Sequence, residues 1–184
     1  MEVYQPAEDS FLIQKHIPNC LKGMDVLDMG TGSGILAITA AKAGANVVAA
    51  DCSEDVLKVA AQNAKLENVK IEFVKSDIFS NISKKFDLII CNPPYLPEDE
   101  IDERIGPSKM YSGGKTGREF IQRFVENAPK FLKPKGKILI VFSTLTGEKK
   151  VLEIFKKNKF EPKILARQKL PWEELILVEA MLST

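Results

Sequence analysis

Short apolar segments alternate with amphipathic segments along this chain, and each apolar segment is about as long as one buried strand. Strands are predicted at residues 24–29, 46–51, 69–74, 86–92, 136–142, 160–166 and 174–180, and helices at 35–43, 54–66, 118–132 and 149–157. This alternation is typical of an α/β fold, in which a parallel sheet carries helices on both faces. The last two strands are joined by residues 168–172 and should form a hairpin, which makes one strand antiparallel. We predict a single domain over 1–184, with an N-terminal helical segment at 1–22 and a long loop at 93–117.

Composition excludes several classes of protein. The chain has 26 Lys and Arg against 25 Asp and Glu, so its formal charge of +1 argues against a broad cationic face for duplex DNA. No apolar run reaches the roughly 18 residues that span a bilayer, and the N-terminus lacks the form of a signal peptide. Three cysteines without CxxC spacing and a single His16 do not suggest a disulfide framework or a metal site. We therefore expect a cytoplasmic protein that binds neither membrane nor metal.

A glycine-rich turn follows the first predicted strand. From Asp28 to Gly34 it reads D-M-G-T-G-S-G, and glycines at such a turn let a ligand approach the backbone amides. The dinucleotide fingerprint GxGxxG would need glycine where Ile35 stands, which disfavours an NAD-dependent oxidoreductase. Taken alone, the turn could equally be a plain tight connection.

Acidic residues end three successive strands at Asp28, Asp51 and Asp77. Open α/β sheets bind ligands at the carboxyl ends of their strands. Asp51 stands where a carboxylate can accept both ribose hydroxyls, and Asp77 could accept from an adenine amino group while Ile78 packs on the ring. Separately, Asp51 could cap a helix and Asp77 could be an ordinary loop residue. Together the three predict a nucleoside site.

The turn Asn92-Pro93-Pro94-Tyr95 directly follows the fourth strand. Two prolines stiffen it, so that the Asn92 side-chain oxygen and the Pro93 carbonyl can accept both hydrogens of one planar NH₂ group. Tyr95 offers a flat surface beside that group. The arrangement suits alkylation of an amide or an aromatic amine, whose delocalised lone pair makes it a poor nucleophile that must be held in line. A rigid turn with a packed tyrosine is the alternative.

Taken together, these residues resemble class I S-adenosylmethionine-dependent methyltransferases over essentially the whole chain. Two further segments are similar to the HemK/PrmC glutamine methyltransferases in their short archaeal and eukaryotic form. Residues 3–12 read V-Y-Q-P-A-E-D-S-F-L, like that family's opening V-Y-x-P-x-E-D-[ST]-x-L. Residues 113–118 read G-G-K-T-G-R and match its G-G-x-x-G-R. The four segments also occur in the family's order.

The resemblance implies a Rossmann-like, mostly parallel seven-stranded sheet and S-adenosylmethionine as cofactor, with S-adenosylhomocysteine as product. It implies N5-methylation of the glutamine in the Gly-Gly-Gln loop of a class I peptide-chain release factor. The residues implied to line the cofactor site are Ser10, Asp28, Gly30, Gly32, Gly34, Asp51, Asp77, Ile78 and Asn92. Those implied to hold the substrate amide are Asn92, Pro93, Pro94 and Tyr95.

Partners are also expected from the resemblance. Only about 23 residues precede the first strand, too few for the helical recognition domain of the bacterial branch, and the short branch pairs with a small zinc-binding activator protein. Residues 69–74 should form an edge strand suited to that heterodimer contact. The alternative is an ordinary edge strand, protected by Lys70, Glu72 and Lys75. An acidic run at 97–103 would repel a nucleic-acid backbone and so favours a protein substrate, although it could equally be a disordered loop tip. The alternatives are an adenine- or guanine-amino methyltransferase of DNA or RNA, and a non-catalytic cofactor-binding scaffold subunit.

Overall fold

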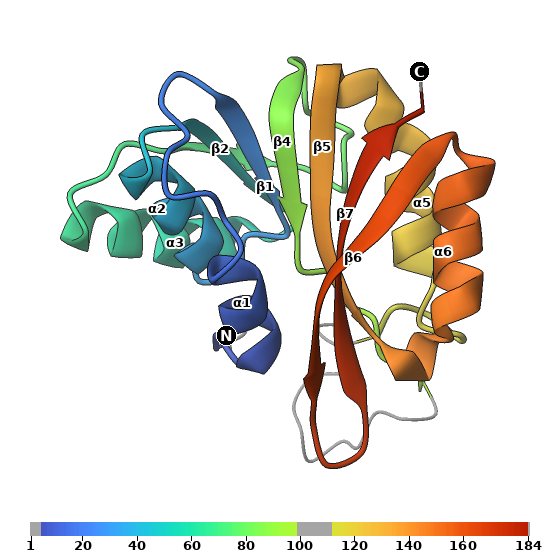
Figure 1. The fold of residues 1–184 in the computed structure, drawn as a ribbon. Coiled ribbons are helices and arrows are strands. Elements are labelled where there is room, and N and C mark those ends of the chain that lie inside the picture. The colour runs from blue at the N-terminus through green and yellow to red at the C-terminus, as the bar shows by residue number, and fades with distance from the viewer. Residues whose placement is uncertain (1–4, 99–111, 184) are drawn as a thin grey trace.

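All seven predicted strands form, and they build one sheet (Figure 1). The computed structural model describes residues 5–98 and 112–183. The strands are β1 (Asp25–Met29), β2 (Asn46–Asp51), β3 (Glu72–Lys75), β4 (Phe86–Cys91), β5 (Leu132–Ser143), β6 (Phe160–Lys169) and β7 (Glu174–Leu182). The helices are α1 (Glu8–Gln14), α2 (Ile35–Lys42), α3 (Glu54–Leu66), α5 (Glu119–Asn127) and α6 (Glu148–Lys157), with 3₁₀ turns η3 (Ala128–Phe131) and η4 (Thr144–Thr146).

The strand order is β3-β2-β1-β4-β5-β7-β6. Neighbouring strands from β3 to β5 pair in parallel, whereas β7 is antiparallel to both β5 and β6. The closing hairpin and the single antiparallel strand are therefore confirmed. The direction of winding reverses between β1 and β4, and such a switch point opens a ligand-binding crevice at the carboxyl ends of the strands.

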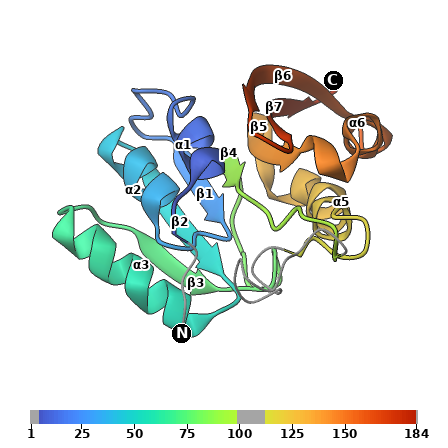
Figure 2. The same cartoon turned by 90° about the horizontal axis from the view of Figure 1, so that it is seen from below.

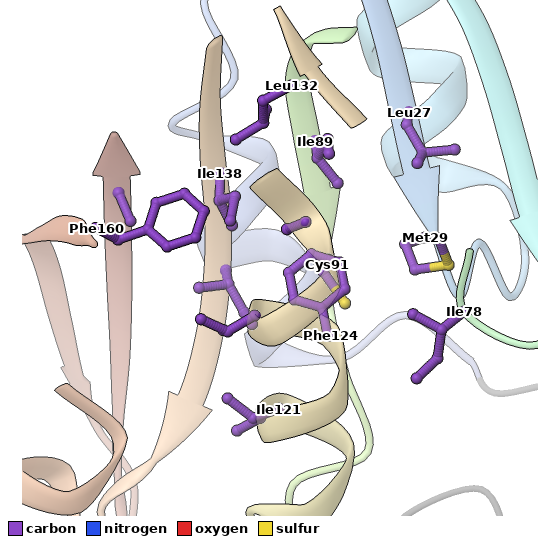
Figure 3. Packing of buried hydrophobic residues seen from close by; sticks show 14 of the residues in the cluster. Leu27, Met29, Ile78, Ile89, Cys91, Ile121, Phe124, Leu132, Ile138 and Phe160 are labelled. Carbon is purple, nitrogen blue, oxygen red and sulfur yellow. The ribbon is translucent and has the colours of Figure 1, made fainter. Parts of the chain in front are cut away.

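The central strands β1, β2 and β4 are mostly apolar and buried, because helices cover both faces of the sheet there. Figure 2 shows α1, α2 and α3 on one face and α5 and α6 on the other. Along β1, Val26 packs into the core under α1 and α2, while Leu27 packs into the core under α5 and α6. In this second core, Ile121 and Phe124 of α5 lie against the sheet near Cys91 (Figure 3). No helix in the described part of the chain is long and apolar enough to cross a membrane.

The helix predicted at 118–132 is wrong at its C-terminal end. Helix α5 ends at Asn127, residues Ala128–Phe131 form a 3₁₀ turn, and Leu132 already begins β5. Pro129 lies in that turn and has no N–H to continue an α-helical ladder. The strand predicted at 136–142 is correspondingly longer.

The edge strand predicted at 69–74 also differs. Strand β3 begins only at Glu72, because the preceding residues complete helix α3. Asn68 has a positive φ of 53°, and the Val69 N–H donates to the Ala64 carbonyl at 3.1 Å. By contrast, Ser53 caps α3 as predicted and accepts a hydrogen bond from the Val56 N–H at 3.4 Å.

Candidate active site

A cavity of about 520 Å³ opens at the carboxyl ends of β1 to β4. This volume is within the usual range for pockets that hold small ligands. Predicted site residues that line it are Ser10, Gly30, Gly32, Asp51, Asp77, Ile78, Asn92, Pro93, Pro94 and Tyr95. Helix α1 and the β6–β7 hairpin supply further walls. The structure therefore brings most of the predicted cofactor residues together with the whole Asn-Pro-Pro-Tyr turn.

The glycine turn needs its glycines for backbone conformation. Gly30, Gly32 and Gly34 have φ values of +73°, +53° and +86°, a region that residues with a Cβ rarely adopt. Gly30 and Gly32 line the cavity, but Gly34 does not. A Cβ on Gly34 would lie 3.2 Å from the Ala60 Cβ, so this glycine permits the close approach of α2 to α3.

Asp28 lies behind the glycine turn rather than on the cavity surface. Its carboxylate accepts from the Thr31 hydroxyl at 2.7 Å and from the Ala37 N–H at 3.1 Å. It is buried, and its Oδ1 has no hydrogen-bond partner among the described residues. Burial raises the pKa of the Asp28 carboxyl to about 6, against the lowering effect of its hydrogen bonds. Asp28 therefore supports the glycine turn through hydrogen bonds from the protein interior.

Asp51 lines the cavity at the end of β2, as predicted. One carboxylate oxygen accepts from the Gly32 N–H at 3.3 Å, and the other accepts from the Ser53 N–H at 3.0 Å. These bonds fix the carboxylate between the glycine turn and α3. A carboxylate has about four acceptor positions, so Asp51 can still accept from a ligand hydroxyl.

Beyond β3, Asp77 and Ile78 line the cavity. Asp77 is paired with Arg123 of α5 at 3.0 Å, a contact that the sequence did not suggest. Ile78 is buried with a φ of +50°, which is costly for a β-branched residue. The Ser76 hydroxyl holds this conformation by donating to the Ile78 carbonyl at 2.7 Å. The turn thus presents an apolar side chain where ring packing was predicted.

The Asn-Pro-Pro-Tyr turn is held by helix α1. The Asn92 side-chain NH₂ donates to the Ser10 hydroxyl at 3.2 Å, which fixes the orientation of the amide. The Asn92 Oδ1 is buried and has no hydrogen-bond partner among the described residues. The Tyr95 hydroxyl donates to the Asp9 carboxylate at 3.1 Å. Asp9 belongs to the E-D-[ST] part of the opening motif, but no role was assigned to it from the sequence.

The glycines of residues 113–118 pack against the same turn from outside. A Cβ on Gly113 would lie 2.7 Å from the Pro94 carbonyl oxygen, and one on Gly117 would collide with the Tyr95 carbonyl oxygen. The Gly113 N–H donates to the Leu96 carbonyl at 3.0 Å. These contacts tie the end of the long loop to the Asn-Pro-Pro-Tyr turn. Val3, Tyr4 and residues 99–111, including most of the acidic run, lie outside the described residues.

Cys91 is fully buried directly before Asn92, and burial raises the pKa of its thiol well above the usual range. Such a thiol is a poor nucleophile at neutral pH. Within residues 5–98 and 112–183, no group of three His, Cys, Asp or Glu side chains is arranged to hold a metal ion.

The β6–β7 hairpin was not predicted to contribute to the site. Leu170, Glu173 and Leu175 nevertheless line the cavity. No local motif marks these residues, and only the pairing of the last two strands places them at this edge of the sheet.

Comparisons with known proteins agree with this geometry. The model of the methyltransferase small domain matches residues 8–163. A protein of Methanocaldococcus jannaschii, provisionally named a protein N5-glutamine methyltransferase, is 45% identical over 182 residues, which cover 97% of this chain and 91% of that protein. The release factor glutamine methyltransferase of Streptococcus pneumoniae is 36% identical over 155 residues, which cover 79% of this chain but only 55% of that protein. The match thus spans about half the length of the bacterial relative.

Among solved structures, a chain of the E. cuniculi Mtq2–Trm112 complex has the same fold. That complex is described as responsible for methylation of the eRF1 translation termination factor. The TM-score between the two chains is 0.80 at 24% identity, with both chains covered completely. Together with the sheet described above, this confirms the predicted Rossmann-like fold.

Proposed function

The chain belongs to the methyltransferase small domain family, and we propose that it transfers a methyl group from S-adenosylmethionine to the side-chain nitrogen of a glutamine in a class I peptide-chain release factor. The target is the glutamine of the Gly-Gly-Gln loop. The names of the M. jannaschii and S. pneumoniae relatives support the glutamine and the release factor, respectively. We further propose that the reaction takes place in the cytoplasm.

The observation that carries this proposal is the buried, unpartnered Oδ1 of Asn92. A buried acceptor without a donor costs free energy, and such a group is retained where a ligand satisfies it. Because the Ser10 hydroxyl already binds the Asn92 NH₂, a donor from a bound ligand would be needed to satisfy the Oδ1. The NH₂ group of a glutamine side chain is such a donor, and the Pro93 carbonyl could accept its second hydrogen.

The cavity fits the proposed cofactor. Gly30 and Gly32 expose backbone where no side chain intervenes, Asp51 keeps acceptor positions for ribose hydroxyls, and Ile78 supplies an apolar contact for adenine. When bound, S-adenosylmethionine supplies an electrophilic methyl group on a sulfonium sulfur.

The residues of the turn would act by position and by charge. With both amide hydrogens held, the nitrogen would be positioned for its weak lone pair to form the new N–C bond while the S–C bond of the methyl donor breaks. Positive charge that develops on nitrogen is stabilised by the two acceptor oxygens. One N–H proton then becomes acidic and leaves to solvent, so a strongly basic side chain is not required.

We also propose a small zinc-binding partner protein at the exposed edge of β3. The Mtq2 chain was solved with a second subunit, Trm112, which supports a partner subunit of this kind. In the described sheet β3 pairs only with β2, so its other side offers unpaired backbone groups to an added strand.

The direct test is methyl transfer from labelled S-adenosylmethionine, with and without a small zinc-binding partner. The acceptors are a release factor with an intact Gly-Gly-Gln loop, its Gln→Ala version, and adenine-containing DNA and RNA. Label only on the intact loop is expected. Label on nucleic acid and none on the release factor would instead assign the same turn to an adenine amino group.

A further inference from the structure

The β6–β7 hairpin forms a firmly anchored wall of the cavity. Its two strands remain paired as far as Lys169 and Glu174. The Leu170 N–H then donates to the Glu173 carbonyl at 2.8 Å and closes the tip of the hairpin. Arg167 binds Glu148 of α6 at 2.6 Å and Glu174 at 2.8 Å. In Figure 1 the hairpin extends beyond the carboxyl end of β4. It therefore presents its tip residues, Leu170–Glu173, in a fixed position.

Glu173 presents a buried acceptor in this wall. Its Oε2 is buried without a hydrogen-bond partner among the described residues, and the residue lines the cavity. Two other side-chain atoms of the described residues are also buried without a hydrogen-bond partner. They are the Asn92 Oδ1 in the same cavity and the Asp28 Oδ1 behind the glycine turn. Asn92 is accounted for by the substrate amide. Glu173 has no role in the proposed transfer, and leaving a carboxylate oxygen desolvated is costly unless a ligand supplies a donor.

The order of strands places Glu173 on the substrate side of Asn92. The cofactor residues Gly30, Asp51 and Asp77 follow β1, β2 and β3, on one side of β4. Glu173 immediately precedes β7, which lies beyond β5 on the other side of β4. A ligand that reaches from Asn92 to Glu173 therefore extends away from the cofactor.

We propose that Glu173 binds the main chain of the substrate loop, with its carboxylate accepting N–H donors of the residues next to the target glutamine. This inference rests on the proposed function. Glycines beside the glutamine leave their N–H groups unshielded, so that they can reach a buried acceptor in a wall. Hydrogen bonds to a carboxylate are about twice as strong as those between neutral groups, which suits a contact that fixes the loop.

The neighbouring Trp172 extends the same contact outward. It is 92% exposed at the hairpin tip, next to the residue that lines the cavity. An exposed tryptophan at the edge of a binding site offers a large, rigid apolar surface of the kind that dominates protein interfaces. Trp172 would cover the residues of the release factor that flank the loop.

The test compares Glu173→Ala and Glu173→Gln with wild type, using a release factor with an intact Gly-Gly-Gln loop and any required partner subunit. Loss of a hydrogen bond to a charged group predicts a decrease of about 10- to 100-fold in kcat/KM for Glu173→Ala, mainly through KM. Glu173→Gln keeps an acceptor and should stay within about 5-fold of wild type. Glu161→Ala, at the exposed far end of β6, is the matched control and should not change activity.

Several results would overturn the inference. One is wild-type kcat/KM in Glu173→Ala. Another is equal damage by both variants, which would indicate a basic side chain as the donor. A third is weakened S-adenosylhomocysteine binding in Glu173→Ala that matches the activity loss, which would make Glu173 a cofactor residue. If wild type itself labels only nucleic acid, the proposed function fails together with this inference.

Trp172→Ala provides a second measurement that does not depend on a buried position. It should raise KM for the release factor by about 3- to 10-fold without changing the melting temperature. Leu66→Ala, which removes a side chain 79% exposed at the end of α3, should leave KM unchanged. An unchanged KM in Trp172→Ala would contradict the outward part of the contact.

Discussion

At the scale of single residues, Asn92 and Ser10 should contribute unequally to the reaction. Asn92→Ala removes the buried acceptor, so kcat should fall by about two to three orders of magnitude, as when one group that stabilises a transition state is lost. Ser10→Ala keeps the acceptor but removes the hydroxyl that orients the amide at 3.2 Å, so about a 10-fold decrease is expected. Single-turnover rates at saturating release factor measure the effect of each of the two substitutions. Equal losses would mean that Ser10 has a contact of its own with the reactants.

Asp28 should make the stability of the protein depend on pH. Its pKa is raised from 3.8 to about 6 by burial, so the folded chain binds the proton more tightly than the unfolded chain does. The associated stability is fully present below pH 4 and is lost as pH rises through 6, a difference of roughly 3 kcal/mol at neutral pH. Asp28→Asn cannot ionise and should lack this decrease.

Urea unfolding between pH 4 and 7.5, without cofactor, measures the effect of Asp28. The free energy of unfolding of Asp28→Asn should decrease less over this range than that of wild type. Glu161→Gln, which changes an exposed carboxyl, should follow the wild-type curve. If the free energies of unfolding of wild type and Asp28→Asn changed in parallel with pH, the pKa of the Asp28 carboxyl would not be raised by folding.

At the scale of elements, the segment at 113–118 should control the geometry of the Asn-Pro-Pro-Tyr turn. Gly117 has a φ of +73°, and a Cβ there would collide with the Tyr95 carbonyl oxygen. Gly117→Ala should therefore displace the turn and decrease kcat by about 100-fold, because small displacements at a reacting centre are this costly. Gly23→Ala is the matched control, since Gly23 has a φ of +78° but no atom within 4 Å of the added Cβ. It should lose about 1 kcal/mol of stability and no activity.

Some boundaries of the helices and strands follow from local signals in the sequence, whereas others do not. Strand β2 and helix α3 have the predicted bounds, because apolar runs and the Ser53 cap are local signals. The start of β3 and the end of α5 were wrong, because the Val69 N–H completes a helix and Pro129 interrupts one. Both boundaries depend on local backbone geometry, which the pattern of apolar residues does not show.

The same distinction applies to the site. The Asn-Pro-Pro-Tyr turn and the glycine turn are contiguous in sequence, so their shapes could be predicted from residue type. Glu173 and Arg123 reach the cavity region through the pairing of β7 and the packing of α5, which no spacing in the sequence shows. The position of Asp28 behind the turn depends on where its side chain points, and residue type does not fix that.

At the scale of the whole molecule, the two edges of the described sheet differ. The β6 edge carries Pro162 and an irregular register between Ile164 and Ala166, both of which hinder the addition of a strand. The β3 edge, Glu72–Lys75, contains no proline. This difference favours β3 as the edge that pairs with a partner subunit.

Blocking the β3 edge should separate partner binding from folding. The Ser76 N–H donates to the Asp51 carbonyl at 2.9 Å, so the alternation of backbone groups turns the Lys75 N–H away from β2. Lys75→Pro removes a donor that the sheet does not use and should abolish co-purification with a small zinc-binding partner. Its melting temperature should stay within a few degrees of wild type. Lys75→Ala keeps the N–H and should bind normally, whereas a stable complex with Lys75→Pro would place the partner elsewhere on the molecule.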